Sequence, residues 1–315
     1  MDAALLLLAD SRLPAGGHAH SGGVEEAVRA GAVTGPGDLA RFLRGRLATA
    51  GLVSAALAAA ACELGSTGEL GSARELGSTG GLGSARELGS AVIDAPAPSA
   101  NARRRPAGLA SESTGPEMAG GPPEPIVLWR RLDAEADART SSPAQREAAR
   151  TQGRLLVRTA RRIWPSPVLE TLARAVPEGA HHPIALGAAA AAADCDPGQA
   201  ALAAAYASVT GPATAAVRLL GLDPVTVHRL LADLAPSLDE TARAARTAAR
   251  PERGAADPDS RWAPGPDGEG VADPDLVGPE FAGDTWWAAL PAAAAPALDL
   301  LAENHLKAET RLFVS

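Results

Sequence analysis

Apolar residues recur at the three- and four-residue spacing of an α-helix through most of this chain. The first long run follows Asp38, which we expect to be an N-cap. Gly51 is a weak point within it, because glycine destabilises the interior of a helix. The apolar positions of the run are Leu39, Phe42, Leu43, Leu47, Leu52, Leu57 and Cys62. This pattern predicts one long helix buried in a core.

Similar patterns predict further helices along the chain. Ser142, Pro143 and Gln145 form a strong start signal, because a serine N-cap and a proline at the first helical position both favour initiation. Pro165 is expected to end this helix near Trp164. The predicted helices cover 24–30, 126–138, 142–164, 184–193, 197–209, 212–220, 224–234, 236–250 and 296–311. We therefore predict an all-α protein, with the helices packed as a single bundle domain.

Two compositionally biased stretches interrupt this pattern. Residues 63–125 begin with repeats of E-L-G-S-A-R and E-L-G-S-T-G, and residues 250–283 are rich in proline, glycine and aspartate. Such segments bury too little apolar surface to offset their chain entropy, so both are expected to be disordered insertions. The helical domain is then divided into 1–62, 126–249 and 284–315. A β-helix of hexapeptides is the alternative for the repeats, but each copy carries only one large apolar residue.

Composition narrows the class of protein. The chain is 46% apolar with a net charge of −8, which favours packed helices and argues against a nucleic-acid binder. Its two cysteines, Cys62 and Cys195, form neither a disulfide framework nor a zinc motif, so a reducing cytoplasm fits. Leu5–Leu8 lacks the basic flank of a signal peptide. The alanine-rich run Leu47–Cys62 falls short of a membrane span. We expect a cytoplasmic protein without a membrane segment.

A row of arginines spaced four apart follows the predicted helix 142–164. At 3.6 residues per turn such a row drifts slowly around the helix and forms one basic stripe. The stripe is either a solvated face or a contact with an acidic or phosphate-bearing partner, and the pattern leaves both open. Its members are Arg146, Arg150, Arg154, Arg158 and Arg162.

Candidate metal ligands are few. His18 and His20 form an isolated H-x-H in a glycine-rich stretch, a weak signal for a metal such as nickel, which suits imidazole ligands. His181 and His182 are expected to act in a helix cap or a loop. The acidic run of Asp133, Glu135 and Asp137 alternates in sequence, which favours the solvated end of a helix over a metal site.

Catalytic motifs are not found in the sequence. It contains neither the G-x-S-x-G of many serine hydrolases nor the G-x-x-x-x-G-K-[ST] of P-loop GTPases. We therefore expect no catalytic residue and no cofactor. A small helical metal-dependent enzyme that uses the His18 and His20 loop remains the alternative.

The chain ends in an apolar and aromatic segment, Leu312-Phe313-Val314-Ser315. A free terminus normally frays, so this segment is expected to dock, either in its own core or on a partner.

Five stretches resemble the urease accessory protein UreF family. They are L-A-D-S-R-L-P-A-G-G-H-A-H-S-G-G-V-E at 8–25, R-T-S-S-P-A-Q-R-E-A-A-R-T-Q-G at 139–153, H-H-P-I-A-L-G at 181–187, A-V-R-L-L-G-L-D-P at 216–224 and T-R-L-F-V-S at 310–315. They occur in the family's order and span the chain apart from the two biased stretches.

The resemblance implies a non-catalytic, all-helical homodimer that acts in urease maturation. Such a protein binds UreD (also called UreH), recruits the GTPase UreG to apo-urease for nickel insertion, and can gate that GTPase. The family's tail contact with UreD/UreH falls on Arg311, Leu312 and Phe313. The basic residues Arg146, Arg150 and Arg154 are further candidates for partner binding. The two biased stretches depart from the family pattern.

Overall fold

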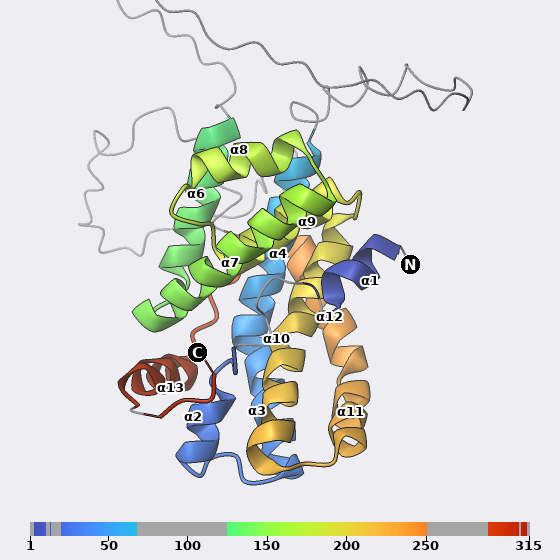
Figure 1. Cartoon of the computed structure of the whole chain (residues 1–315). Coiled ribbons are helices and arrows are strands. Elements are labelled where there is room, and N and C mark those ends of the chain that lie inside the picture. Colours follow the sequence, from blue (N-terminus) through green and yellow to red (C-terminus); the bar gives the residue numbers. More distant parts are fainter. Residues whose placement is uncertain are drawn as a thin grey trace, which may run out of the picture.

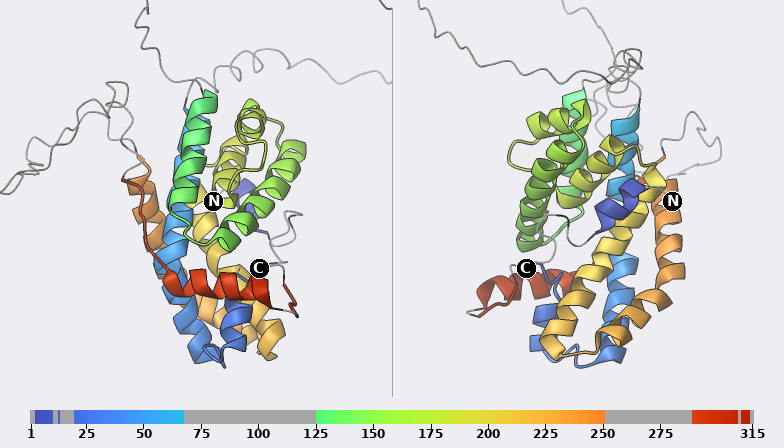
Figure 2. Two further views of the ribbon diagram at one scale, coloured as in Figure 1. Left: turned by 90° about the vertical axis from the view of Figure 1, so that its left-hand side faces the viewer. Right: turned by 45° about the vertical axis from the view of Figure 1, so that its right-hand side comes forward.

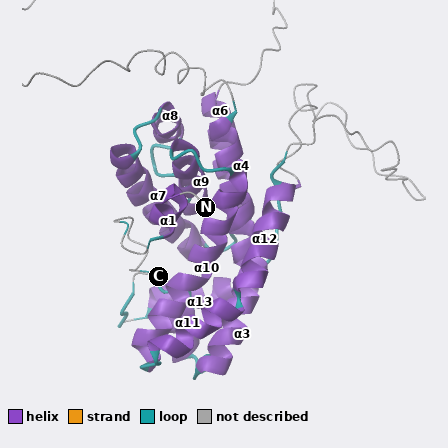
Figure 3. Cartoon of the chain, turned by 90° about the vertical axis from the view of Figure 1, so that its right-hand side faces the viewer, coloured by secondary structure: helices purple, strands orange, loops and turns teal. Residues whose placement is uncertain are grey.

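The computed structural model describes residues 3–10, 13, 20–67, 125–250, 289–308 and 310–313. Within these ranges the regular structure is helical throughout, with no strand (Figures 1 and 3). The predicted all-α class is therefore confirmed. Most of the two predicted insertions, 63–125 and 250–283, lies outside the described residues.

The first long helix predicted from the sequence lies at the centre of the bundle. It runs from Pro36 to Ser66 as three consecutive segments, α3 (Pro36–Arg46), a π-helical turn η2 (Leu47–Gly51) and α4 (Leu52–Ser66). Helices α9 (His182–Ala192), α10 (Pro197–Leu220) and α12 (Ala235–Ala248) pack around α4 (Figure 1).

Small side chains let these helices approach closely. Nearly all alanines of α4, α9 and α10 are buried. A Cβ on Gly187 would lie 2.2 Å from the carbonyl oxygen of Ala58, so the glycine is required where α9 crosses α4. The alanine-rich composition thus reflects close helix packing rather than a lack of core.

The remaining helices complete two ends of the bundle. At one end, α7 (Pro143–Ile163) and α8 (Pro167–Ala175) pack on α9, and α6 (Pro125–Ala138) packs on α8 and α4. At the other, α2 (Val24–Arg29) and α11 (Pro224–Asp233) pack on α10, and α1 (Ala3–Ala9) packs on α9 and α10. Helix α13 (Pro296–Lys307) contacts α2 and α7 and crosses the long helices at a steep angle (Figure 2).

In the described part of the chain, two helices are apolar enough by length and composition to cross a membrane, Pro36–Ser66 and Pro197–Leu220. In both, more than half of the most apolar window is buried inside the bundle, 61% and 56%. A helix that is mostly buried in a protein core can be as long and as apolar as a membrane span. Burial in the core therefore accounts for the apolar composition of these two helices.

Several predicted boundaries were wrong for local reasons. The first insertion was expected to begin at residue 63, but α4 continues to Ser66. Asp38 is not the N-cap of α3. Gly35 holds that position, and Asp38 lies in the first turn, where its carboxylate accepts hydrogen bonds from the backbone N–H and hydroxyl of Thr34. Helix α8 was not predicted, although Ser166 and Pro167 repeat the start signal of Ser142 and Pro143.

Pro212 does not separate two helices, because α10 continues through it. A proline inside a helix leaves the carbonyl four residues earlier without its usual partner. Here that carbonyl belongs to Ser208, and it accepts a hydrogen bond of 2.8 Å from Nε of Arg46. The side chain of Arg46, which is the N-cap residue of η2, thus replaces the missing backbone donor.

Candidate functional site

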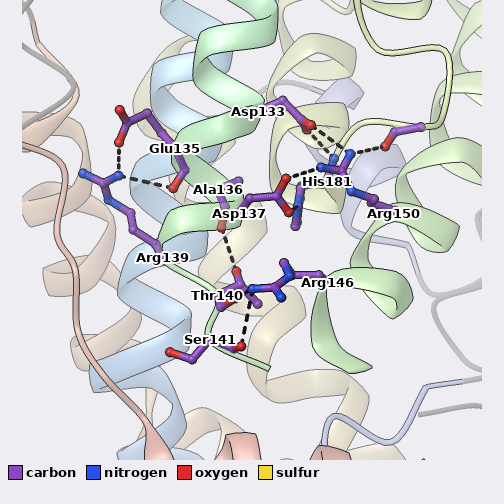
Figure 4. Close-up of polar contacts among 11 residues, drawn as sticks. Asp133, Glu135, Ala136, Asp137, Arg139, Thr140, Ser141, Arg146, Arg150 and His181 are labelled. Atoms are coloured by element: carbon purple, nitrogen blue, oxygen red, sulfur yellow. Dashed lines mark hydrogen bonds and ion pairs between the residues drawn. The ribbon is translucent and has the colours of Figure 1, made fainter. Parts of the chain in front are cut away.

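A partly buried polar cluster joins α6, α7 and the start of α9 (Figure 4). The guanidinium of Arg150 donates to Oδ2 of Asp133 at 2.8 Å and to Oδ2 of Asp137 at 2.5 Å. It also donates to the Gly179 carbonyl at 2.9 Å. The backbone N–H of His181 donates to Asp133 at 2.9 Å, and its ring nitrogen Nε2 lies 2.8 Å from Oδ1 of Asp137. Polar groups of α6, α7 and the segment 179–181 that leads into α9 therefore satisfy one another.

The expectation of a solvated acidic run was wrong for Asp133. This residue is only 4% exposed. Asp133 and Asp137 are four residues apart, so they share one face of α6 and turn toward α7, whereas Glu135 pairs with Arg139. His181 holds the N-cap position of α9, as expected for a residue in a helix cap. Its side chain, however, contacts Asp137 and makes no hydrogen bond to the helix end.

Asp133, Asp137 and His181 also have the composition of a metal site. One ligand atom from each lies within 4.8 Å of the others. However, the guanidinium of Arg150 already forms ion pairs with both carboxylates. Burial would raise the pKa of Asp137, but hydrogen bonds and charges from His181 and Arg150 outweigh it and hold that pKa below its usual value. We interpret the cluster as an ion-pair network that joins three helices.

The arginine row on α7 does not form a uniform surface. Arg146 donates to the Thr140 carbonyl at 2.7 Å, and Arg150 lies in the buried cluster. Arg154 is exposed but donates to the Glu178 carbonyl at 2.7 Å. Arg158 and Arg162 are exposed at the other end of the helix. Arg150 therefore joins α6 and the segment before α9 to α7, whereas Arg154, Arg158 and Arg162 are exposed.

The C-terminal tail is held by polar groups distant in sequence. The buried carboxylate of Glu25 accepts the backbone N–H of Leu312 at 2.7 Å and that of Phe313 at 3.1 Å. Arg29 donates to the Thr310 carbonyl at 2.9 Å. Nε2 of His305 donates to the carbonyl of Phe313 at 3.2 Å, since a carbonyl can only accept. We call these residues and segment 310–313 the tail latch.

The tail latch buries one aromatic side chain and exposes its neighbours. Phe313 is 6% exposed and lies beneath the guanidinium of Arg218, 5.2 Å from the ring centroid. Leu312 is 68% exposed, and Arg311 is also exposed. Of the two expectations for the terminus, the structure places Phe313 in the chain's own core. Sequence reasoning missed Glu25, His305 and Arg218, since no local pattern links them to residues near 312.

His18 lies outside the described residues, whereas His20 is buried and lines a cavity. His182 lines the same cavity. Burial, together with the nearby His20, lowers the pKa of His182 to about 4, so that imidazole is neutral at physiological pH. In the described part of the chain, the one group of three possible metal ligands is Asp133, Asp137 and His181. Neither His20 nor His182 belongs to it.

Comparison with known proteins gives consistent matches. A family model described as UreF matches residues 121–235. A protein of Mycobacterium sp. (strain JLS) named urease accessory protein UreF is 39% identical over 241 residues, covering 76% of this chain and 83% of the relative. A relative of the same name from Mycolicibacterium vanbaalenii is 39% identical over 240 residues, with the same coverage of both chains. One from Mycobacterium tuberculosis is 36% identical over 243 residues, covering 77% of this chain and 84% of the relative. The chain therefore belongs to the UreF family of urease accessory proteins, which are not enzymes.

Proposed function

We propose that this chain acts in urease maturation as a scaffold, holding UreD/UreH and the GTPase UreG on apo-urease during nickel insertion. Membership of the UreF family supports the maturation role. The scaffold would act through binding energy, by keeping partners in register and shifting their conformational equilibria. A homodimer in the cytoplasm that can gate the GTPase completes the proposal. The alternative of a metal-dependent enzyme is set aside, because the family consists of accessory proteins.

The observation that carries the proposal is the geometry of the tail latch. Glu25 holds the backbone of Leu312 and Phe313, so the chain direction of the tail is set before any partner arrives. An ordered segment loses little conformational entropy on binding. The exposed Leu312 provides an apolar contact in a fixed position, and Arg311 adds a charge beside it. We propose that these two side chains contact UreD/UreH, while Phe313 anchors the tail to its own chain.

A second contact is proposed along the exposed end of α7. Arg154, Arg158 and Arg162 present positive charge there and would suit an acidic surface of the GTPase. Arg146 and Arg150 are less suitable for a partner contact, because both are partly buried and hydrogen-bonded within the chain. Arg154 also donates to the Glu178 carbonyl, but its side chain is exposed.

The tail contact is tested by changing Leu312 to aspartate and measuring the affinity for UreD/UreH by calorimetry. A charge placed in an apolar contact should weaken binding by about tenfold or more. Val225→Asp is the matched control, because Val225 is also an exposed aliphatic residue (76%) but lies on α11. Both variants should keep the helicity of the parent. Equal affinities for Leu312→Asp and the parent protein would rule out the tail contact.

A further inference from the structure

A cavity of about 380 Å³ lies within the bundle and has no assigned role. Its wall includes parts of α1, α4, α7, α9, α10 and α13. Its volume is within the range of small-molecule sites, roughly 300–1,000 Å³. The larger aliphatic side chains of the wall include Leu8, Leu13, Val53, Leu57, Leu156 and Leu186. A ligand with an apolar body would fit such a wall.

Arg46 brings a charge to this wall. Its Nε donates to the Ser208 carbonyl and its Nη1 to the Gly22 carbonyl, each at 2.8 Å. Among the described residues no carboxylate forms an ion pair with it. Burial lowers the pKa of Arg46 to about 10, so the guanidinium stays charged at pH 7. Arg46 is partly buried, and a cation that is partly removed from water without a paired anion is unfavourable. Its Nη2 donates to none of the described residues, so its N–H groups can serve another acceptor.

Three irregular features of the backbone converge on Arg46. The π-helical turn η2 begins directly after it, and π turns of this kind often occur at functional sites. Pro212 leaves the Ser208 carbonyl free to accept Nε of Arg46. Gly22 adopts a φ of +59°, and a Cβ there would lie 3.2 Å from Nη2 of Arg46. Gly51 completes the junction, since its Cβ would lie 2.8 Å from Oγ of Ser208. The local sequence therefore positions this one guanidinium.

Other charged groups in the wall leave Arg46 as an anion anchor. Asp299 accepts the side-chain N–H of Gln145 on the α13 side of the cavity, and Asp10 has interactions of its own. His182 carries no charge at pH 7, because its pKa lies near 4. Arg218 stacks on Phe313. A monocarboxylate can pair with Arg46 and present an aliphatic body to the leucines, whereas inorganic phosphate has no apolar body to cover that part of the wall.

We propose that the cavity binds a small organic monocarboxylate, with Arg46 pairing with the carboxylate and the aliphatic wall covering its apolar body. Such a ligand would link the junction of η2 and α10 to α7, α9 and α13 across the cavity. It would stabilise the folded chain by mass action.

The test uses the full chain and octanoate as the probe, with calorimetry to measure affinity. Octanamide, which has a similar shape but no charge, and inorganic phosphate are the comparison ligands. Arg46→Gln should weaken octanoate binding by about tenfold or more. Arg44→Gln is the matched control, because Arg44 is exposed on the same helix, and it should bind octanoate like the parent protein. If Arg46→Gln loses helicity, Arg46→Lys keeps the charge without the planar fork and should bind with intermediate affinity.

Saturating octanoate should also raise the melting temperature of the parent protein more than that of Arg46→Gln. The proposal is contradicted if octanoate does not bind, or if octanamide or phosphate binds as tightly. Equal affinity of octanoate for the parent protein and Arg46→Gln would contradict it too.

Discussion

At the scale of single residues, Glu25 illustrates why sequence patterns miss functional contacts. Two glutamates in the first turn of a helix suggest an interaction with the helix dipole. Instead, the carboxylate of Glu25 is buried and accepts two backbone N–H groups from residues 287 and 288 positions away. Such hydrogen bonds to a charged acceptor are worth about 1.5–3 kcal/mol each.

Replacing Glu25 with alanine should therefore release the tail without unfolding the bundle. We expect the backbone amides of Leu312 and Phe313 to exchange hydrogen about tenfold faster or more, while amides of α4 keep their protection. Glu26→Ala is the control, since Glu26 pairs with Arg29 and accepts no hydrogen bond from the tail amides. Unchanged exchange at Leu312 and Phe313 in Glu25→Ala would show that other contacts hold the tail.

At the scale of elements, close helix contacts depend on glycines whose surroundings the sequence does not reveal. Gly153 lies in α7, where a Cβ would be 1.8 Å from the carbonyl oxygen of Ala180. Gly45 lies in α3 with no atom within 4 Å of the position a Cβ would take. Both look alike in the sequence, as single glycines inside helices, yet they have opposite consequences for stability.

Replacing these two glycines with alanine should change the free energy of unfolding in opposite directions. Gly153→Ala should lower the free energy of unfolding by about 1–3 kcal/mol or more, because backbone must move to admit the methyl group. Gly45→Ala should raise it by roughly 0.5–1 kcal/mol, because alanine restricts the unfolded chain and favours the helix. Urea unfolding followed by circular dichroism measures both. A Gly153→Ala protein as stable as the parent would mean that α7 can shift away from the segment before α9.

At the scale of the whole molecule, helical periodicity predicted the fold class because most helices bury one face. Together with the start signal, the periodicity predicted α7 well, and its N-cap Ser142 accepts the backbone N–H of Gln145 as expected. It failed at Pro212, since only the tertiary contact with Arg46 makes a proline acceptable there. The site was harder to predict. The arginines of α7 were found, but the sequence could not show that Asp133 and Asp137 engage Arg150 and leave Arg154 exposed.

The proposed scaffold joins two partners into one assembly. Sedimentation velocity of the purified chain mixed with UreD/UreH and UreG tests it most directly, because it measures the mass of every species. We expect one species that contains all three proteins, and its loss when this chain is left out. Sedimentation of UreG with UreD/UreH in the absence of this chain, or mutually exclusive binding of the two partners, would contradict the scaffold role.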